Sequence, residues 1–242
     1  MIWLYDDYEA LSSAAAGLFV QQARHATQAR GRFSVALAGG HTPRRAYELL
    51  ALGPSSTRVP WGQVHVFWGD ERCVPVDDQR SNARMARQAL LARVSIPPTQ
   101  IHPIACTGTP HEAAELYQAV LQAFFGDQPS RFDLVLLGLG ENGHTASLFP
   151  GTPVLHEQER WVAAVHAAAT EVDRVTLTAP LINQARVVAF LISGSSKASI
   201  LREVLEGSPD PERFPAQLIQ PAKGELHWLV DQEAAGLLTR KA

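Results

Sequence analysis

Short apolar runs alternate along the chain with longer segments in which apolar residues recur every three or four positions. The short runs are rich in β-branched and aromatic residues, which favour strands, whereas the longer segments have the spacing of amphipathic helices. The pattern predicts strands at residues 33–38, 64–68, 132–137, 161–167, 187–192 and 226–230. It predicts helices at residues 8–29, 42–52, 82–93, 111–125 and 196–205, and a short closing helix after the last strand.

Residues at the ends of these segments support the prediction. Gly31 follows the first helix, Pro43 falls in the first turn of the second, and Ser81 is suited to cap the third. Strands that alternate with helices are typical of a layered α/β sheet. We therefore expect one α/β domain over residues 1–242, with mostly parallel strands flanked by helices, and a surface loop at residues 53–60.

Composition narrows the class of protein. The 242 residues are 46% hydrophobic and 19% charged, with a net charge of −3, as in a soluble globular protein. No apolar run approaches the ~18 residues that could cross a bilayer, so we expect no membrane span. Asp6 and Asp7 stand where a signal peptide would carry positive charge, which predicts a cytoplasmic protein.

The cysteine and basic residues exclude further classes of protein. Cys73 and Cys106 are too few for a secreted disulfide framework and lack a C-x-x-C metal spacing, so both are expected to be reduced. The 18 Arg and 3 Lys residues are scattered, and no nucleic-acid-binding stripe is present. Against this background Lys197, which lies in a loop, stands out.

Three segments near strand ends have compositions suited to anion binding, at the positions where open α/β sheets bind ligands. Residues 39–43 (GGHTP) combine two glycines with a helix start, which fits either a phosphate site or an empty tight turn. Residues 194–197 (GSSK) form a similar turn, whose Lys197 is either a phosphate contact or solvated. The charges of residues 70–72 (DER) must either pair with one another or bind a ligand. Arg174, in an otherwise uncharged run, is either a second anion contact or a surface residue.

A fourth loop carries the main candidate for acid–base chemistry. Residues 138–143 (GLGENG) formally match the dinucleotide-binding pattern G-x-G-x-x-G. The prolines at 150 and 153 break the chain where the required helix should continue, which argues against that interpretation. His144 follows the glycines directly and is expected to act as an acid or base, because imidazole titrates near neutral pH. The alternative is a histidine that only bonds to the backbone of its loop.

Together these segments resemble the 6-phosphogluconolactonase family, which has a Rossmann-like sheet architecture in common with glucosamine-6-phosphate deaminase and ribose-5-phosphate isomerase. The resemblance rests on residues 39–43, 70–75 with 81–82, 143–151, 174–178 and 194–198, in the family's order. The family commonly has a small residue at the position of His41 and Asp at that of Asn142. Because Asn cannot carry negative charge, Asp70 or Glu141 is expected to orient His144 instead.

The resemblance implies hydrolysis of 6-phospho-D-glucono-1,5-lactone to 6-phosphogluconate, in the oxidative pentose phosphate pathway, without metal or cofactor. It also implies functional coupling to glucose-6-phosphate dehydrogenase. His144 would act first as base and then as acid, with Arg72 and N–H groups around Gly143 near the oxyanion. Arg72 as a phosphate ligand is the alternative. The expected catalytic residues are His144, Arg72 and Asp70, and the expected phosphate-binding residues are Gly39, Gly40, Thr42, Arg174 and Lys197.

Two other functions stay open. A sugar-phosphate isomerase or deaminase of the same superfamily needs a second carboxylate, usually in an Asn-Glu-Pro sequence soon after the histidine, and residues 147–150 (SLFP) supply none. A non-catalytic sugar-phosphate-binding module would lack the proton-transfer residue, whereas His144 is present. The net charge of −3 further predicts that an anion is recognised by a local pocket and not by the overall charge.

Overall fold

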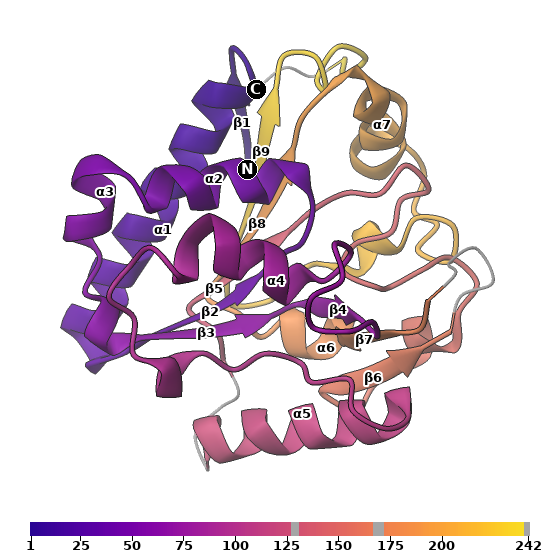
Figure 1. The fold of residues 1–242 in the computed structure, drawn as a ribbon. Coiled ribbons are helices and arrows are strands. Elements are labelled where there is room, and N and C mark those ends of the chain that lie inside the picture. The colour runs from indigo at the N-terminus through magenta and orange to yellow at the C-terminus, as the bar shows by residue number, and fades with distance from the viewer. Residues whose placement is uncertain (127–130, 167–171, 240–242) are drawn as a thin grey trace.

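The computed structural model describes residues 1–126, 131–166 and 172–239, and its centre is a six-stranded sheet flanked by helices (Figure 1). All neighbouring strands of this sheet are parallel. The strand order is β1 (Ile2–Tyr5), β9 (Glu225–Asp231), β8 (Val187–Ile192), β5 (Leu134–Leu137), β2 (Phe33–Leu37) and β3 (Val64–Trp68). Every residue of β2, β5 and β8 is buried, as expected for a parallel sheet covered on both faces.

A second, antiparallel sheet lies beside the first. It has three strands in the order β4 (Asp70–Arg72), β7 (Arg174–Leu177) and β6 (Val162–Val165). Only Gly69 separates β4 from β3, so the chain passes from one sheet to the other at the carboxyl end of β3. Helix α5 (Pro110–Phe125) packs against β6 and β7.

The remaining helices connect the strands. They are α1 (Tyr8–Arg30), α2 (His41–Leu50), α3 (Gly53–Arg58), α4 (Asn82–Ala86), α6 (Ala179–Ile182) and α7 (Ala198–Glu206), with a π-helical turn at Arg87–Leu91. Short 3-10 turns occur at 61–63, 98–100, 153–156, 195–197 and 215–218. The side chain of Asp7 accepts the N–H of Ala10 at the start of α1, and Gly31 ends this helix with φ 73°.

The structure confirms the predicted parallel sheet and most of its elements, with some differences. The strands β1 and β7 and the short helix α6 were not predicted, and the helix predicted at 82–93 is α4 followed by the π-helical turn. The charged residues 70–72 form a strand and not a loop, and residues 53–58 form α3 where a loop was expected. Residues 232–239 form turns instead of a closing helix. The predicted strand at 161–167 is β6, and residue 167 lies outside the described part of the chain.

The expectation that both cysteines are reduced is wrong. Cys73 and Cys106 form a disulfide, with their Cα atoms 5.1 Å apart. Cys73 directly follows β4 and Cys106 lies shortly before α5, and both of these elements pack against β7, which brings the two thiols together. In the described part of the chain no helix is long and apolar enough to span a membrane.

Two buried tyrosines hold the carboxyl ends of β2 and β3. The hydroxyl of Tyr47 donates to the carbonyl of Ala38 at 2.9 Å and accepts its N–H at 3.0 Å. The hydroxyl of Tyr117 makes the same pair of bonds to Trp68, at 3.3 and 2.8 Å. Burial raises the pKa of both phenols, so both hydroxyls keep their protons. The loops that follow β2 and β3 therefore start from fixed points.

Candidate active site

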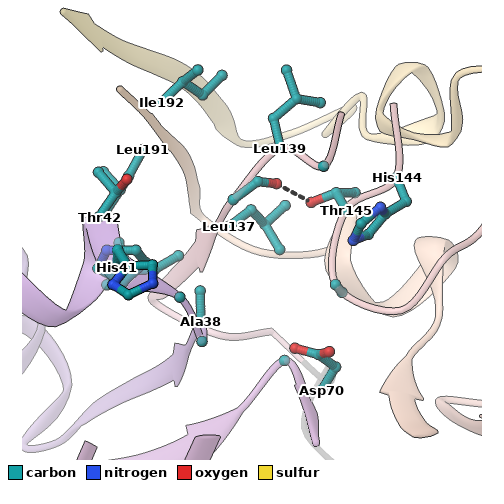
Figure 2. Close-up of a pocket in the computed structure, with 18 of the residues that line it drawn as sticks. Ala38, His41, Thr42, Asp70, Leu137, Leu139, His144, Thr145, Leu191 and Ile192 are labelled. Atoms are coloured by element: carbon teal, nitrogen blue, oxygen red, sulfur yellow. Dashed lines mark hydrogen bonds between the residues drawn. The ribbon is translucent and has the colours of Figure 1, made fainter. Parts of the chain in front are cut away.

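A cavity of about 480 Å³ opens at the carboxyl ends of β2, β3, β5 and β8 (Figure 2). Figure 2 shows His41 and Thr42 on one side of this cavity and His144 on the other, with Asp70 below them. All of the site residues predicted from the sequence line it: Gly39, Gly40, Thr42, Asp70, Arg72, His144, Arg174 and Lys197. Its volume is in the range of small-molecule sites.

The loop after β5 is shaped to present His144. The N–H of Gly140 donates to the carbonyl of His144 at 2.8 Å, and the N–H of Gly143 donates to the carbonyl of Gly140 at 3.0 Å. A Cβ atom on Gly140 would lie 2.0 Å from Nδ1 of His144, so only glycine leaves room for the ring. No helix follows β5 in this loop, so the glycine pattern does not form a dinucleotide site. The glycines instead form the turn that holds the imidazole of His144.

This turn uses one of the N–H groups around Gly143 that were expected near the oxyanion. The N–H of Gly143 itself donates to the carbonyl of Gly140 inside the turn. The guanidinium groups of the cavity are further donors that can serve a developing negative charge.

Asn142 is the hydrogen-bond partner of the His144 ring. Oδ1 of Asn142 lies 2.5 Å from Nδ1 of His144 and also accepts the backbone N–H of His144 at 3.3 Å. Neither acid that was expected to orient the ring does so, since the carboxylate of Asp70 bonds to other side chains and Glu141 pairs with Lys197 at 3.8 Å. The missing charge of Asn142 had favoured one of these acids, but its side-chain oxygen makes the hydrogen bond to the ring.

The surroundings keep His144 neutral. Burial lowers its pKa to about 4; Asp70 raises the pKa, while Arg174, Lys197 and Arg72 lower it further. The ring also packs against Phe149, with centroids 4.5 Å apart. At neutral pH His144 is therefore an uncharged base. Because Oδ1 of Asn142 can only accept a hydrogen bond, the ring proton is assigned to Nδ1 and the lone pair to Nε2.

Two polar residues that the sequence did not assign to the site hold Asp70. The hydroxyl of Ser147 donates to its Oδ2 at 2.7 Å, and Nδ2 of Asn82 donates to its carbonyl at 2.9 Å and to its Oδ1 at 3.3 Å. The side chain of Asn82 lies so close to Gly39 that a Cβ there would be 1.9 Å from its Oδ1. Both residues lie in segments on which the family resemblance rests, but the sequence did not show that they bond to Asp70.

Glu71 has a structural role at the start of α4. Its buried carboxylate accepts the N–H groups of Asn82 and Ala83, each at 2.7 Å, and that of Arg72 at 2.8 Å, together with the hydroxyl of Ser81 at 3.1 Å. Burial raises its pKa, and the backbone hydrogen bonds act in the opposite direction. Among the described residues, no ion pair joins Arg72 to Asp70 or Glu71. The three charges of residues 70–72 thus do not neutralise one another.

Two arginines lie opposite each other at the cavity. Arg72 on β4 and Arg174 on β7 are register partners, and the Nε atom of each is buried without a hydrogen-bond partner among the described atoms. Burial and then the charge of Arg72 lower the pKa of Arg174. Like charges directly opposite on two strands are unfavourable. Together with Lys197, this pair makes a cavity suited to an anion.

The described residues contain no group of three or more His, Cys, Asp or Glu side chains that could hold a metal ion.

Comparison with known proteins places the chain in a family. The family model for glucosamine-6-phosphate isomerases/6-phosphogluconolactonase matches residues 6–228. A 6-phosphogluconolactonase of Synechocystis is 47% identical over 210 residues, which cover 85% of this chain and 84% of that protein. One from Nostoc is 40% identical over 96% of both chains. The structure of 6-phosphogluconolactonase from Trypanosoma cruzi superposes with a TM-score of 0.86 and 30% identity, covering 99% of this chain and 97% of that one. On these matches, the chain belongs to the family of glucosamine-6-phosphate isomerases and 6-phosphogluconolactonases.

Proposed function

We propose that this chain, as one catalytic domain over residues 1–242, hydrolyses 6-phospho-D-glucono-1,5-lactone to 6-phosphogluconate. The observation that carries the proposal is the position of His144 in a cavity that also holds Arg72, Arg174 and Lys197, where burial lowers the pKa of the imidazole. A base that is uncharged at neutral pH is what water attack on a lactone needs, and the cations suit a phosphorylated substrate. The names of the relatives support the same reaction.

The phosphate is assigned to one side of the cavity. Gly39, Gly40 and Thr42 lie at the start of α2, which has no side-chain cap and so offers backbone N–H groups and the positive end of its dipole. Lys197 and Arg174 add two cations that line the same cavity. Held there, the 6-phosphate orients the lactone ring so that its carbonyl carbon faces His144.

The reaction then needs two proton transfers. Nε2 of His144 removes a proton from water as the water oxygen bonds to the carbonyl carbon, and the carbonyl oxygen becomes an oxyanion next to Arg72. Asp70 stabilises the imidazolium, in line with the direction in which it moves the pKa of His144. The intermediate collapses, the bond from the carbonyl carbon to the ring oxygen breaks, and the imidazolium donates its proton to that oxygen. The new carboxylic acid releases its proton to solvent.

Another enzyme must produce the proposed lactone substrate. The lactone arises when glucose-6-phosphate is oxidised at C1, so the proposal couples this chain functionally to glucose-6-phosphate dehydrogenase in the pentose phosphate pathway. We further propose that the chain acts in the cytoplasm.

The test generates the lactone in place with glucose-6-phosphate dehydrogenase and follows its disappearance against spontaneous hydrolysis. Acceleration by the chain, lost in His144→Ala, supports the proposal. No acceleration, with retained binding of 6-phosphogluconate, favours a binding module. Release of ammonia from glucosamine-6-phosphate favours the deaminase, and loss of activity with a chelator favours metal-assisted hydrolysis.

A further inference from the structure

A disulfide borders the strand that carries Arg72 and Asp70. Cys73 is the residue directly after Arg72, and its partner Cys106 is 33 residues away in sequence. Both cysteines are half-buried, and they lie in loops with exposed neighbours such as Val76, which is 79% exposed. A small dithiol therefore has a short path to the S–S bond.

The disulfide ties the start of the 73–81 loop to the segment before α5. The backbone N–H groups of Val74, Asp78 and Ser81 donate to carbonyl oxygens of residues 72–78, at 2.8–3.1 Å. The N–H of Cys73 also donates, at 2.8 Å, to the carbonyl of Asp173, which directly precedes β7. Opening the disulfide would remove the covalent tie at the start of the loop and leave this backbone hydrogen bond.

The same loop positions the guanidinium of Arg72. Nη1 of Arg72 donates to the carbonyl of Arg80 at 2.6 Å, and the side chain of Arg80 is in turn paired with Asp78 at 2.8 Å. A change in the path of residues 73–80 therefore moves the acceptor that fixes Arg72 in the cavity.

We propose that Cys73–Cys106 is a reversible redox modification site, at which a dithiol reductant frees the 73–81 loop, loosens Arg72 and lowers turnover. In reducing compartments the disulfides that do form are mostly transient, catalytic or redox-sensing. One thiolate of the reductant attacks a sulfur of the disulfide, the S–S bond breaks, and the other cysteine leaves as a thiolate that takes up a proton. The second thiol of the reductant displaces the first cysteine in the same way. The protein gains two electrons and two protons, and the dithiol becomes a disulfide.

The effect on turnover rests on the proposed function, whereas the thiol chemistry does not. In the first experiment the chain is purified without reductant and incubated under native conditions with or without dithiothreitol. It is then alkylated in denaturant, and its mass is measured by mass spectrometry. We expect no adduct without dithiothreitol and two adducts after it. Two adducts before reduction would overturn the proposal.

The second experiment measures function in both states. We expect reduction to lower kcat/KM for the lactone by up to about tenfold, the size of effect expected when one charge-assisted hydrogen bond is weakened, and reoxidation to restore it. A Cys73→Ser/Cys106→Ser variant should have the kcat/KM of the reduced chain, and dithiothreitol should not change it. Asp78→Asn, which removes the negative charge that pairs with Arg80 and leaves the cysteines in place, should reproduce part of the loss while remaining oxidised.

Equal kcat/KM in the two states, with two new thiols in the reduced one, would overturn the regulatory role. A chain that hydrolyses no lactone in either state contradicts the proposed function instead. Calorimetric binding of 6-phosphogluconate then decides the further inference, because weaker binding after reduction supports it and equal binding overturns it.

Discussion

Oδ1 of Asn142 lies 2.5 Å from Nδ1 of His144 and also accepts the backbone N–H of that residue. An amide oxygen accepts hydrogen bonds and carries no charge, so it fixes the tautomer of the ring without favouring the imidazolium. The pair therefore separates two tasks that an aspartate would combine, namely orienting the base and raising its pKa.

Replacing Asn142 by Asp should move the pH profile. The carboxylate would favour the imidazolium and raise the pKa of His144 from about 4. Since the base must be neutral, activity is lost as the pH falls through this pKa, and the acidic limb of kcat/KM should shift to higher pH in the variant. An acidic limb at the same pH in both proteins would contradict the assigned role of Asn142.

Removing the imidazole should affect the chemical step. His144→Ala is expected to lower kcat by about 10²- to 10⁴-fold, the usual contribution of general acid–base catalysis, with a much smaller change in KM. Steady-state kinetics, corrected for spontaneous hydrolysis, measure both constants. Retention of kcat near that of the natural chain would require a different base.

Gly140 offers a test of ring placement that leaves His144 intact. In Gly140→Ala the added Cβ would lie 2.0 Å from Nδ1 of His144, so the ring must move. Displacement of a catalytic group by about 1 Å costs on the order of 10²-fold in rate. Gly62→Ala is the control, because its Cβ meets no atom within 4 Å and Gly62 is remote from the cavity lining. Equal activity of the two variants would rule out this steric role.

The cations of the cavity should contribute to binding. Lys197→Met and Arg174→Met are each expected to raise KM for the lactone about tenfold or more, with a smaller effect on kcat, because each removes a charge-assisted contact to the phosphate. Arg202→Met, on the exposed face of α7, is a control that removes one positive charge elsewhere. If it raises KM as much, overall charge and not the local pocket is responsible.

Glu71 should matter for stability. In Glu71→Gln an NH₂ group would face N–H donors of Asn82, Ala83 or Arg72 that the carboxylate now accepts. A buried donor left without an acceptor costs about 1–3 kcal/mol, so the free energy of unfolding should fall by that amount. Urea denaturation followed by circular dichroism provides the measurement. An unchanged midpoint would show that the carboxylate is not needed to hold the start of α4.

The sequence predicted elements best where local chemistry decides them. The boundaries of β3 and β8 agree with their apolar runs, and α1 ends at the glycine expected to end it. The strand β4 was missed because Asp70, Glu71 and Arg72 show no apolar alternation, and their strand character comes from pairing with β7, about a hundred residues later.

For the site, the sequence identified which residues meet but not how they bond. All the predicted residues line one cavity, because parallel strands place their carboxyl ends at the same edge of the sheet. The roles of Asn82 and Ser147 follow from contacts to Asp70 that span 12 and 77 positions, and no local pattern reports such contacts. The same holds for the disulfide, whose cysteines meet only through tertiary packing.

The position of β9 has a consequence for how the chain is made. This strand lies between β1 and β8, and β1 pairs with residues 228–231. During synthesis β1 therefore has no strand to pair with until more than two hundred further residues have been made, and an unpaired strand edge favours aggregation. The pairing of β1 is thus among the contacts that form late, after β9 has left the ribosome.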